Sequence, residues 1–237
     1  MSKPVELIPL ARLALTFVPV MVVIGVLYRW SLGAGMTVYA MGRMLLQLLL
    51  IGYVLTFIFT TEQAGIVGVA LGLMLLIASW IALRPLDSRT GDQYIKALAS
   101  IAIGGVLTLL LVTQLVLDTQ PWFNPSKVIP LAGMIFAQSM TAISLASERF
   151  YAELPRVGSY AEARGIALKA ALIPITNSLF AVGLVSLPGM MTGQILADVD
   201  PLIAARYQIM VMAMLFGSAG ISAACYLTLV KPAEANA

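Results

Sequence analysis

The chain has 237 residues, of which 60% are hydrophobic and 11% are charged, and its formal net charge is +3. A water-soluble domain of this length cannot bury so much apolar surface in one core, so we expect lipid to be its main solvent. Histidine is absent and Cys225 is the single cysteine. This composition excludes an intramolecular disulfide, a His/Cys metal centre and any catalytic dyad that needs histidine.

Long apolar runs follow one another along the whole chain. A helix needs roughly 20 apolar residues to cross about 30 Å of hydrocarbon, and backbone amides in lipid must be paired within each segment. We therefore expect an all-α, polytopic integral membrane protein with about seven transmembrane helices in a single domain, residues 1–237. The predicted spans are 7–28, 36–59, 64–83, 97–117, 128–146, 170–197 and 207–230.

Lysine and arginine collect on one side of this seven-span arrangement. Positively charged short loops stay in the cytoplasm, so we expect the N-terminus outside and the C-terminus inside. The first span has Arg12 inside its start, and we interpret it as a retained helix rather than a cleaved signal peptide.

The segment 147–169 is the one substantial hydrophilic connection, and we expect it to be cytoplasmic. Pro155 and Gly158 predict that it forms two short helical pieces with a break near these residues. Its second half, 160–169, is either the start of the next span or an independent docking element for a partner.

The sequence does not show the residues that usually bind a nucleotide or carry protons across a membrane. None of the five lysines follows a glycine, so the chain cannot form a phosphate-binding P-loop, and any ATP with its Mg²⁺ must bind to another polypeptide. Every Asp and Glu falls at a predicted loop or interface, although the fold could draw Glu62 or Glu148 inward. The buried carboxylate typical of proton-coupled transporters is therefore not predicted, and we expect no cofactor and no catalytic residue on this chain.

Arg43 is the one basic residue well inside a predicted span, and Gln47 lies on the same helical face four residues later. Two interpretations remain open. Either Arg43 extends to the lipid headgroups while Gln47 bonds to a neighbouring helix, or the pair lines a polar vestibule that meets the substrate.

The sixth predicted span contains Pro188 and Gly189, which predict a break or kink. Broken helices at membrane depth can turn backbone groups toward a substrate, but a packing kink is the alternative. Met190 and Met191 follow the break, and thioethers are both soft metal ligands and adaptable space-fillers. The full set of residues predicted to line a transport pathway is Arg43, Gln47, Gln138, Asn177, Ser186, Pro188, Gly189, Thr192 and Gln194.

Several blocks of the sequence resemble the FetB (YbbM) family of iron-export permeases, which also includes plant aluminium-tolerance permeases. The most specific block is Leu-Pro-Gly-Met-Met at 187–191. Other similar blocks lie at 42–43, 47, 52–54, 128–134, 172–174, 182–186, 193, 200–201 and 206–209. The resemblance covers about residues 41 to 228.

The resemblance implies the permease subunit of an ATP-binding cassette (ABC) transporter in the bacterial inner membrane, which is a transport subunit and not an enzyme. It implies a homodimer that works with a separate cytoplasmic ATPase and exports iron or another metal ion. Met190 and Met191, selected above for their thioethers, would then be the candidate metal ligands. The family's ATPase-docking element has its counterpart near Gly158. The implied coupling residues are Glu153, Val157, Gly158, Ser159, Tyr160, Glu162 and Arg164.

Two rival functions remain at this point. The first is an ABC permease for an organic anion such as a nucleotide sugar, for which Arg43 and Arg206 would supply attractive charge. The second is a membrane scaffold or a secondary transporter that has no ATPase. No feature of the sequence indicates a nucleic-acid partner.

Overall fold

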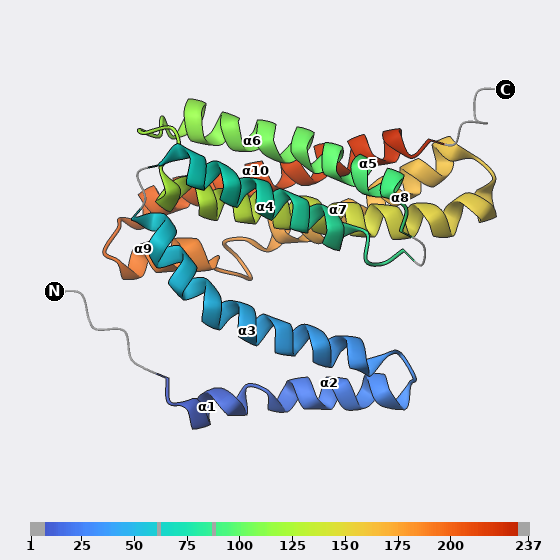
Figure 1. The fold of residues 1–237 in the computed structure, drawn as a ribbon, viewed down its shortest axis with the longest axis horizontal. Coiled ribbons are helices and arrows are strands. Elements are labelled where there is room, and N and C mark those ends of the chain that lie inside the picture. The colour runs from blue at the N-terminus through green and yellow to red at the C-terminus, as the bar shows by residue number, and fades with distance from the viewer. Residues whose placement is uncertain (1–7, 61–62, 87–88, 232–237) are drawn as a thin grey trace. The chain divides into compact units, whose positions relative to one another are not determined.

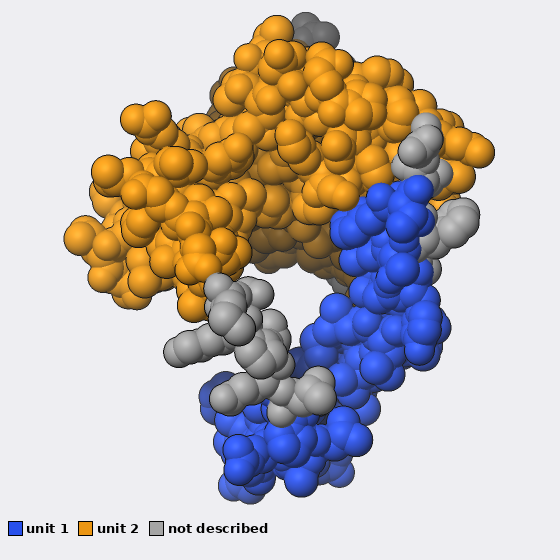
Figure 2. Space-filling view, turned by 90° about the vertical axis from the view of Figure 1, so that its left-hand side faces the viewer, with its two compact units in different colours: residues 1–60 blue, residues 61–237 orange. Residues whose placement is uncertain are grey.

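The computed structural model describes residues 8–60, 63–86 and 89–231. Its chain divides into two compact units, residues 1–60 and 61–237 (Figure 2). In the first unit, two short consecutive helices are followed by a long helix that contacts the second of them. The helices are α1 (Leu10–Leu15), α2 (Val18–Arg29) and α3 (Ala34–Phe59). Gly33 stands before α3 with φ +74°, a conformation that glycine adopts without a steric penalty.

The second unit is a bundle built around α7, the longest helix (Figure 1). Its α-helices are α4 (Ala64–Ala82), α5 (Gly91–Ile101), α6 (Leu107–Leu110), α7 (Pro125–Val157), α8 (Tyr160–Ala181), α9 (Gly189–Leu196) and α10 (Pro201–Leu229). One π-helical stretch, η1 (Ala102–Val106), joins α5 to α6, and a second, η2 (Leu111–Val116), follows α6, so that the four form one continuous span. Helix α7 packs against α4, α8 and α10.

Small residues let these helices approach closely. Ala132, Ala142 and Ala146 of α7 are fully buried, and the hydroxyl of Ser144 donates a 2.8 Å hydrogen bond to the main-chain carbonyl of Ala82 on α4. The lipid-exposed surface of a span is as apolar as its core, so close van der Waals packing and interhelical hydrogen bonds must hold such helices together. The buried alanines of α7 supply the close packing, and Ser144 supplies a hydrogen bond.

Within the described residues, six helical stretches are long and apolar enough to cross a membrane. They confirm the all-α polytopic fold, while the orientation of the chain stays a prediction. The stretch 170–197, predicted as one span, is instead divided between α8 and α9. The predicted break is present, but the helix stops at Ala181, well before Pro188.

The predicted break near Pro155 and Gly158 is confirmed, although each of the two pieces is part of a long helix. Helix α7 runs through Pro155 and ends at Val157. The chain reverses at Gly158, whose φ is +64°. The expected turn at Gly158 is therefore confirmed, and the segment 147–169 is the end of α7 joined to the first half of α8.

Candidate functional site

The break between α8 and α9 is a closed turn. After Ala181 the backbone becomes extended at Val182, and Gly183 has φ +81°. The amide of Gly183 donates to the carbonyl of Ser186 at 3.0 Å, and the amides of residues 184–186 all converge on the carbonyl of Ala181 at 2.8 to 3.2 Å. These bonds satisfy the backbone amides that an interrupted helix would otherwise leave unpaired in lipid.

Helix α9 starts at Gly189 directly after Pro188, and no side chain caps it. The first amides of a helix have no partner inside the helix, and they carry the positive end of its dipole. Pro188, Gly189 and Met190 all line one cavity. The break therefore presents a weakly positive helix start to that cavity.

Three cavities surround the break, and all lie in the second unit. The central cavity, of about 340 Å³, lies between α7, α8, the turn and α10. The first side cavity, of about 500 Å³, lies between the start of α7, α9 and α10. The second side cavity, of about 470 Å³, lies between the end of α8, α9 and α10.

The central cavity shares walls with both side cavities. Met134 and Met190 line the central and the first side cavity, whereas Val182, Gln208 and Met212 line the central and the second side cavity. The three spaces thus form a series separated mainly by flexible methionine side chains and one glutamine. Small rotamer changes of these side chains would join them.

Gln208 is the polar residue most deeply placed in this series. Its side chain lies on α10 with only 6% of the residue exposed, and its carbonyl oxygen is buried without a hydrogen-bond partner. The carbonyl oxygen of Gln194, which lines the first side cavity, is also buried and unpartnered. An unmade bond at a buried polar atom costs about 1–3 kcal/mol, so both oxygens are a local cost in this arrangement of the helices.

The structure brings together many of the predicted pathway residues. Those lining the central cavity are Gln138, Ser186, Pro188, Gly189 and Met190. Gln194 lines the first side cavity and Met191 the second.

Other predicted residues stand apart. Asn177 is exposed on α8, and neither it nor Thr192 lines any of the three cavities. Arg43 and Gln47 belong to α3 in the first unit. The sequence reasoning did not select Met134, Gln208, Met210 or Met212, although a glutamine inside an apolar span was a signal available for Gln208.

The side chains lining the central cavity that could bind a ligand are uncharged. In the part of the chain that the structure describes, no three or more Cys, Asp and Glu residues gather where they could hold a metal ion. No carboxylate lines the central cavity. Thioethers, amides and hydroxyls are therefore what a substrate would meet there.

A second candidate region is the corner where α7 turns into α8. Glu153, one of the predicted coupling residues, is buried, and one of its carboxylate oxygens lies 2.9 Å from Arg149 and 3.2 Å from Arg156. The arginine side chains remain 45% and 73% exposed, whereas that of Glu153 is 7% exposed. Glu148, considered from the sequence as a residue the fold could draw inward, is exposed, and Glu62 lies outside the described residues. At the corner, one buried carboxylate thus holds two exposed arginine side chains in place.

Tyr160, at the start of α8, ties this corner to the end of α10. Its hydroxyl donates a 2.7 Å hydrogen bond to the main-chain carbonyl of Leu227, and its ring meets Phe150 of α7 edge to face at 6.0 Å between centroids. The guanidinium of Arg164 lies 5.3 Å above the same ring, and the hydroxyl of Ser159 accepts from the amide of Glu162 at the helix start. Tyr160 therefore joins three helices at one point.

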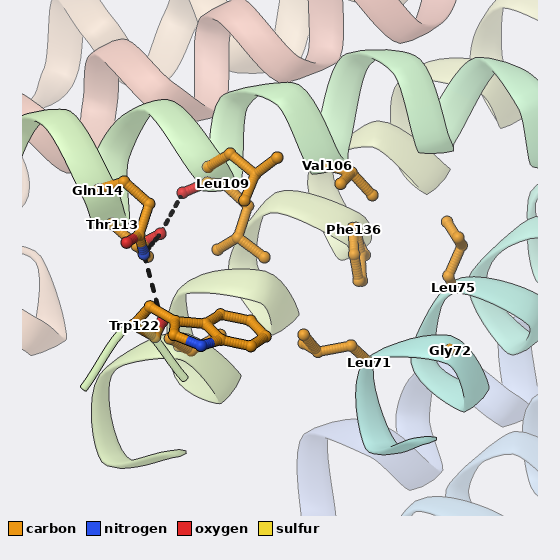
Figure 3. Close-up of a pocket in the computed structure, with 11 residues that line it drawn as sticks. Leu71, Gly72, Leu75, Val106, Leu109, Thr113, Gln114, Trp122 and Phe136 are labelled. Atoms are coloured by element: carbon orange, nitrogen blue, oxygen red, sulfur yellow. Dashed lines mark hydrogen bonds between the residues drawn. The ribbon is translucent and has the colours of Figure 1, made fainter. Parts of the chain in front are cut away.

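A fourth cavity, of about 250 Å³, lies between α4, the span that contains α6, and α7. Its wall is almost entirely apolar, and the amide of Gln114 is occupied by the hydroxyl of Thr113 and the carbonyl of Trp122 (Figure 3). None of the predicted site residues lines it. We therefore place the candidate site at the break and the corner instead.

Comparison with known proteins identifies a family. The family model described as "Uncharacterised protein family (UPF0014)" matches residues 10–164 and 156–233. The chain is 35% identical to "Probable iron export permease protein FetB" of Escherichia coli over 210 residues, which cover 81% of this chain and 80% of that protein. It is 32% identical to "Protein ALUMINUM SENSITIVE 3" of Arabidopsis thaliana over 204 residues, covering 79% and 73% of the two chains.

A further relative is "UPF0014 membrane protein slr1647" of Synechocystis, 35% identical over 196 residues that cover 75% of this chain and 74% of the relative. No solved structure matches the chain. The family model covers nearly all described helices, and the relatives share most of their length with the chain. The chain therefore belongs to the UPF0014 family, and it is a multi-pass membrane protein.

Proposed function

We propose that this protein is the permease subunit of an ATP-driven transporter in the bacterial inner membrane, and that it exports a metal ion. The observation that carries the proposal is family membership over nearly the whole chain, since the Escherichia coli relative is named as a probable iron export permease. The role is that of a transport subunit rather than an enzyme. ATP and Mg²⁺ bind to a separate cytoplasmic ATPase, because this sequence has no P-loop.

The ATPase docks at the corner between α7 and α8, where the chain turns sharply at Gly158 and the side chains of Arg149 and Arg156 are exposed. Helix α7 runs without interruption from this corner to the central cavity, because Glu153 and Met134 both belong to it. Nineteen helical residues separate the two, which is about 28 Å at 1.5 Å per residue. A force that the ATPase applies at the corner is therefore transmitted to the cavity wall by α7, which is one continuous helix.

Helix α10 provides a second connection. Leu227, which accepts the hydrogen bond of Tyr160, lies on the same helix as Gln208 and Met212. Movement of the corner thus reaches both sides of the central cavity. A second copy of the chain completes the transporter, and the inner-membrane lipid surrounds it.

The organic-anion rival receives less support. Of its attractive charges, Arg206 lines none of the three cavities around the break, while Arg43 belongs to the first unit. A metal ion suits the thioether and amide lining better, because such groups are electron-pair donors.

The proposal is tested by co-expressing the tagged chain with the stand-alone ABC ATPase of its own genome and purifying the tagged chain in detergent. We expect the ATPase to co-purify in a fixed ratio, and its ATPase activity to rise on association. Purification of the intact chain with no ATPase under any nucleotide condition would contradict the proposal and favour the scaffold or secondary-transporter alternative.

A further inference from the structure

We propose that the fourth cavity, between α4, the span that contains α6, and α7, holds one acyl chain of a membrane phospholipid. The cavity has a volume of about 250 Å³. The inference goes beyond the proposed function and does not depend on it, because it requires only that these helices cross a bilayer. All of them belong to stretches that are long and apolar enough to do so.

The wall of this cavity combines buried and exposed residues. Leu109, Val128 and Phe136 line it and are at most 5% exposed. Leu110 and Trp122 line it too, and they are 47% and 58% exposed. The cavity therefore extends from the surface of the bundle, which is lipid in a membrane, into the interior of the helix packing.

The chemistry of the wall selects an apolar occupant. The wall is almost entirely apolar, and the amide nitrogen of Gln114 already donates to the hydroxyl of Thr113 and to the carbonyl of Trp122 (Figure 3). The hydroxyl of Thr113 in turn donates a 2.8 Å hydrogen bond to the carbonyl of Leu109. Apolar cavities stay free of water, and a buried ion needs an opposite charge or strong ligands. At membrane depth, the acyl chains of lipid are the apolar groups at hand.

The cavity also has the direction and length of an acyl chain. Figure 3 shows Gln114 and Trp122 at one end and Val106 and Phe136 toward the other. Tryptophan is enriched where hydrocarbon meets the lipid headgroups. Val128 and Phe136 lie eight positions apart on α7, which is about 12 Å at 1.5 Å per residue. Half of a hydrocarbon core of roughly 30 Å is about 15 Å, so a chain that enters beside Trp122 can reach the far end.

Packing supplies the free energy of binding. A chain that moves from the bilayer into the cavity stays in apolar surroundings, so it gains no hydrophobic free energy. Side chains around an empty space, however, lack van der Waals partners on one side, and the chain provides them. Gly72 lines the cavity and leaves room for it, because a Cβ at this position would meet no atom within 4 Å.

A photoactivatable lipid tests where the chain lies. The full-length protein is reconstituted into vesicles of phosphatidylethanolamine and phosphatidylglycerol, with a small share of phosphatidylglycerol that carries a diazirine near the middle of one acyl chain. After illumination, mass spectrometry of peptides identifies the labelled residues. We expect label on Leu109 and Phe136, which are too buried for lipid at the protein surface to reach. Ile143, which is buried on α7 and does not line this cavity, should carry no label.

Filling the cavity from α4 provides the matched variants. Gly72→Leu should lose most of the label on Leu109 and Phe136, because the new side chain occupies the space of the lipid chain. Gly68→Leu is the control, since Gly68 lies one turn earlier on α4, has equally open surroundings and does not line the cavity. It should keep the label of the parent chain.

Thermal unfolding in lipid-free detergent adds a second measurement. Both exchanges replace a glycine within a helix and gain the same helix propensity. Gly72→Leu should nevertheless unfold at a higher temperature than Gly68→Leu, because only the former fills an empty space. If Gly72→Leu does not fold, Gly72→Ala adds a single methyl group and should reduce the label to a smaller extent.

Absence of label from Leu109 and Phe136 in the parent chain would overturn the lipid site. It would show that a protein segment fills the space, such as a second copy, because glycines four residues apart allow helices to approach closely. Equal label in Gly72→Leu and Gly68→Leu would overturn the site as well. Either result would leave ATPase co-purification, and with it the proposed function, as a separate question.

Discussion

The hydroxyl of Tyr160, in the first turn of α8, donates a 2.7 Å hydrogen bond to the main-chain carbonyl of Leu227, near the end of α10. These residues are 67 positions apart in the sequence. The bond therefore fixes the corner between α7 and α8 against a different span. Because α10 also carries Gln208 and Met212, this one contact links the proposed docking surface with the cavity series.

Replacing Tyr160 with phenylalanine tests that link. Tyr160→Phe keeps the ring that packs on Phe150 but removes the hydroxyl, so we expect a loss of about 1 kcal/mol in stability. The ATPase should still bind, while metal efflux per ATP hydrolysed should fall, because the corner moves without α10. Tyr94→Phe is the control, since the hydroxyl of Tyr94 donates to the main-chain carbonyl of Leu76 on α4. Equal coupling ratios in the two variants would remove Tyr160 from the transmission path.

Gly158 gives a prediction about backbone conformation alone. A Cβ at this position would meet no atom within 4 Å, but the φ of +64° is unfavourable for most residues. Gly158→Val should destabilise the turn by about 1–2 kcal/mol and abolish stimulation of the ATPase, while the chain still inserts into the membrane. Gly158→Asn is the matched control, because asparagine tolerates this conformation better. A valine variant with full ATPase stimulation would count against a docking role for the turn.

Glu153 is predicted to order the two exposed arginines of the corner. Glu153→Gln removes the charge that holds Arg149 and Arg156, whose exposed side chains would then move freely in water. We expect a modest loss of stability, on the order of 1 kcal/mol, because both arginines remain solvated, together with weaker ATPase binding in a pull-down at increasing salt. Glu148→Gln, at an exposed position on the same helix, should change neither property. Identical salt profiles for the two variants would assign Glu153 to packing alone.

Gly104 tests how closely the fourth span approaches α10. A Cβ on Gly104 would meet the hydroxyl oxygen of Ser222 and lie 2.7 Å from its main-chain nitrogen. Gly104→Ala should therefore destabilise the protein by about 1–3 kcal/mol through overpacking, which thermal unfolding in detergent would measure. Gly165→Ala, with open space around it, should be neutral or stabilising by up to about 1 kcal/mol. If both alanine variants unfolded at the same temperature, the close packing of Gly104 on α10 would be refuted.

The long spans were predictable because apolar length alone determines whether a helix can cross lipid. The break in the sixth span was also predicted, but its position was not. Pro188 indicated the break, whereas the helix ends at Ala181 because Val182 and Gly183 adopt extended and left-handed backbone conformations. The break near Pro155 and Gly158 was predicted more closely, since α7 ends at Val157 and the chain reverses at Gly158.

The cavity walls were only partly predictable, for a geometric reason. Met190 and Gln194 follow a recognisable helix break, so the sequence indicates them directly. Met134 and Met212 come from other helices, and their meeting depends on how α7 and α10 rotate and pack, which local patterns do not determine. Gln208 could have been selected as a polar residue in an apolar span by the reasoning that selected Gln47.

The central claim is that this chain conducts metal only when a separate ATPase drives it. The most direct test reconstitutes the purified permease into liposomes loaded with a metal-sensitive dye, with and without the ATPase and Mg-ATP. The account predicts metal transport only when the ATPase and hydrolysable nucleotide are both present. Metal movement at the same rate through the permease alone, without nucleotide, would contradict it.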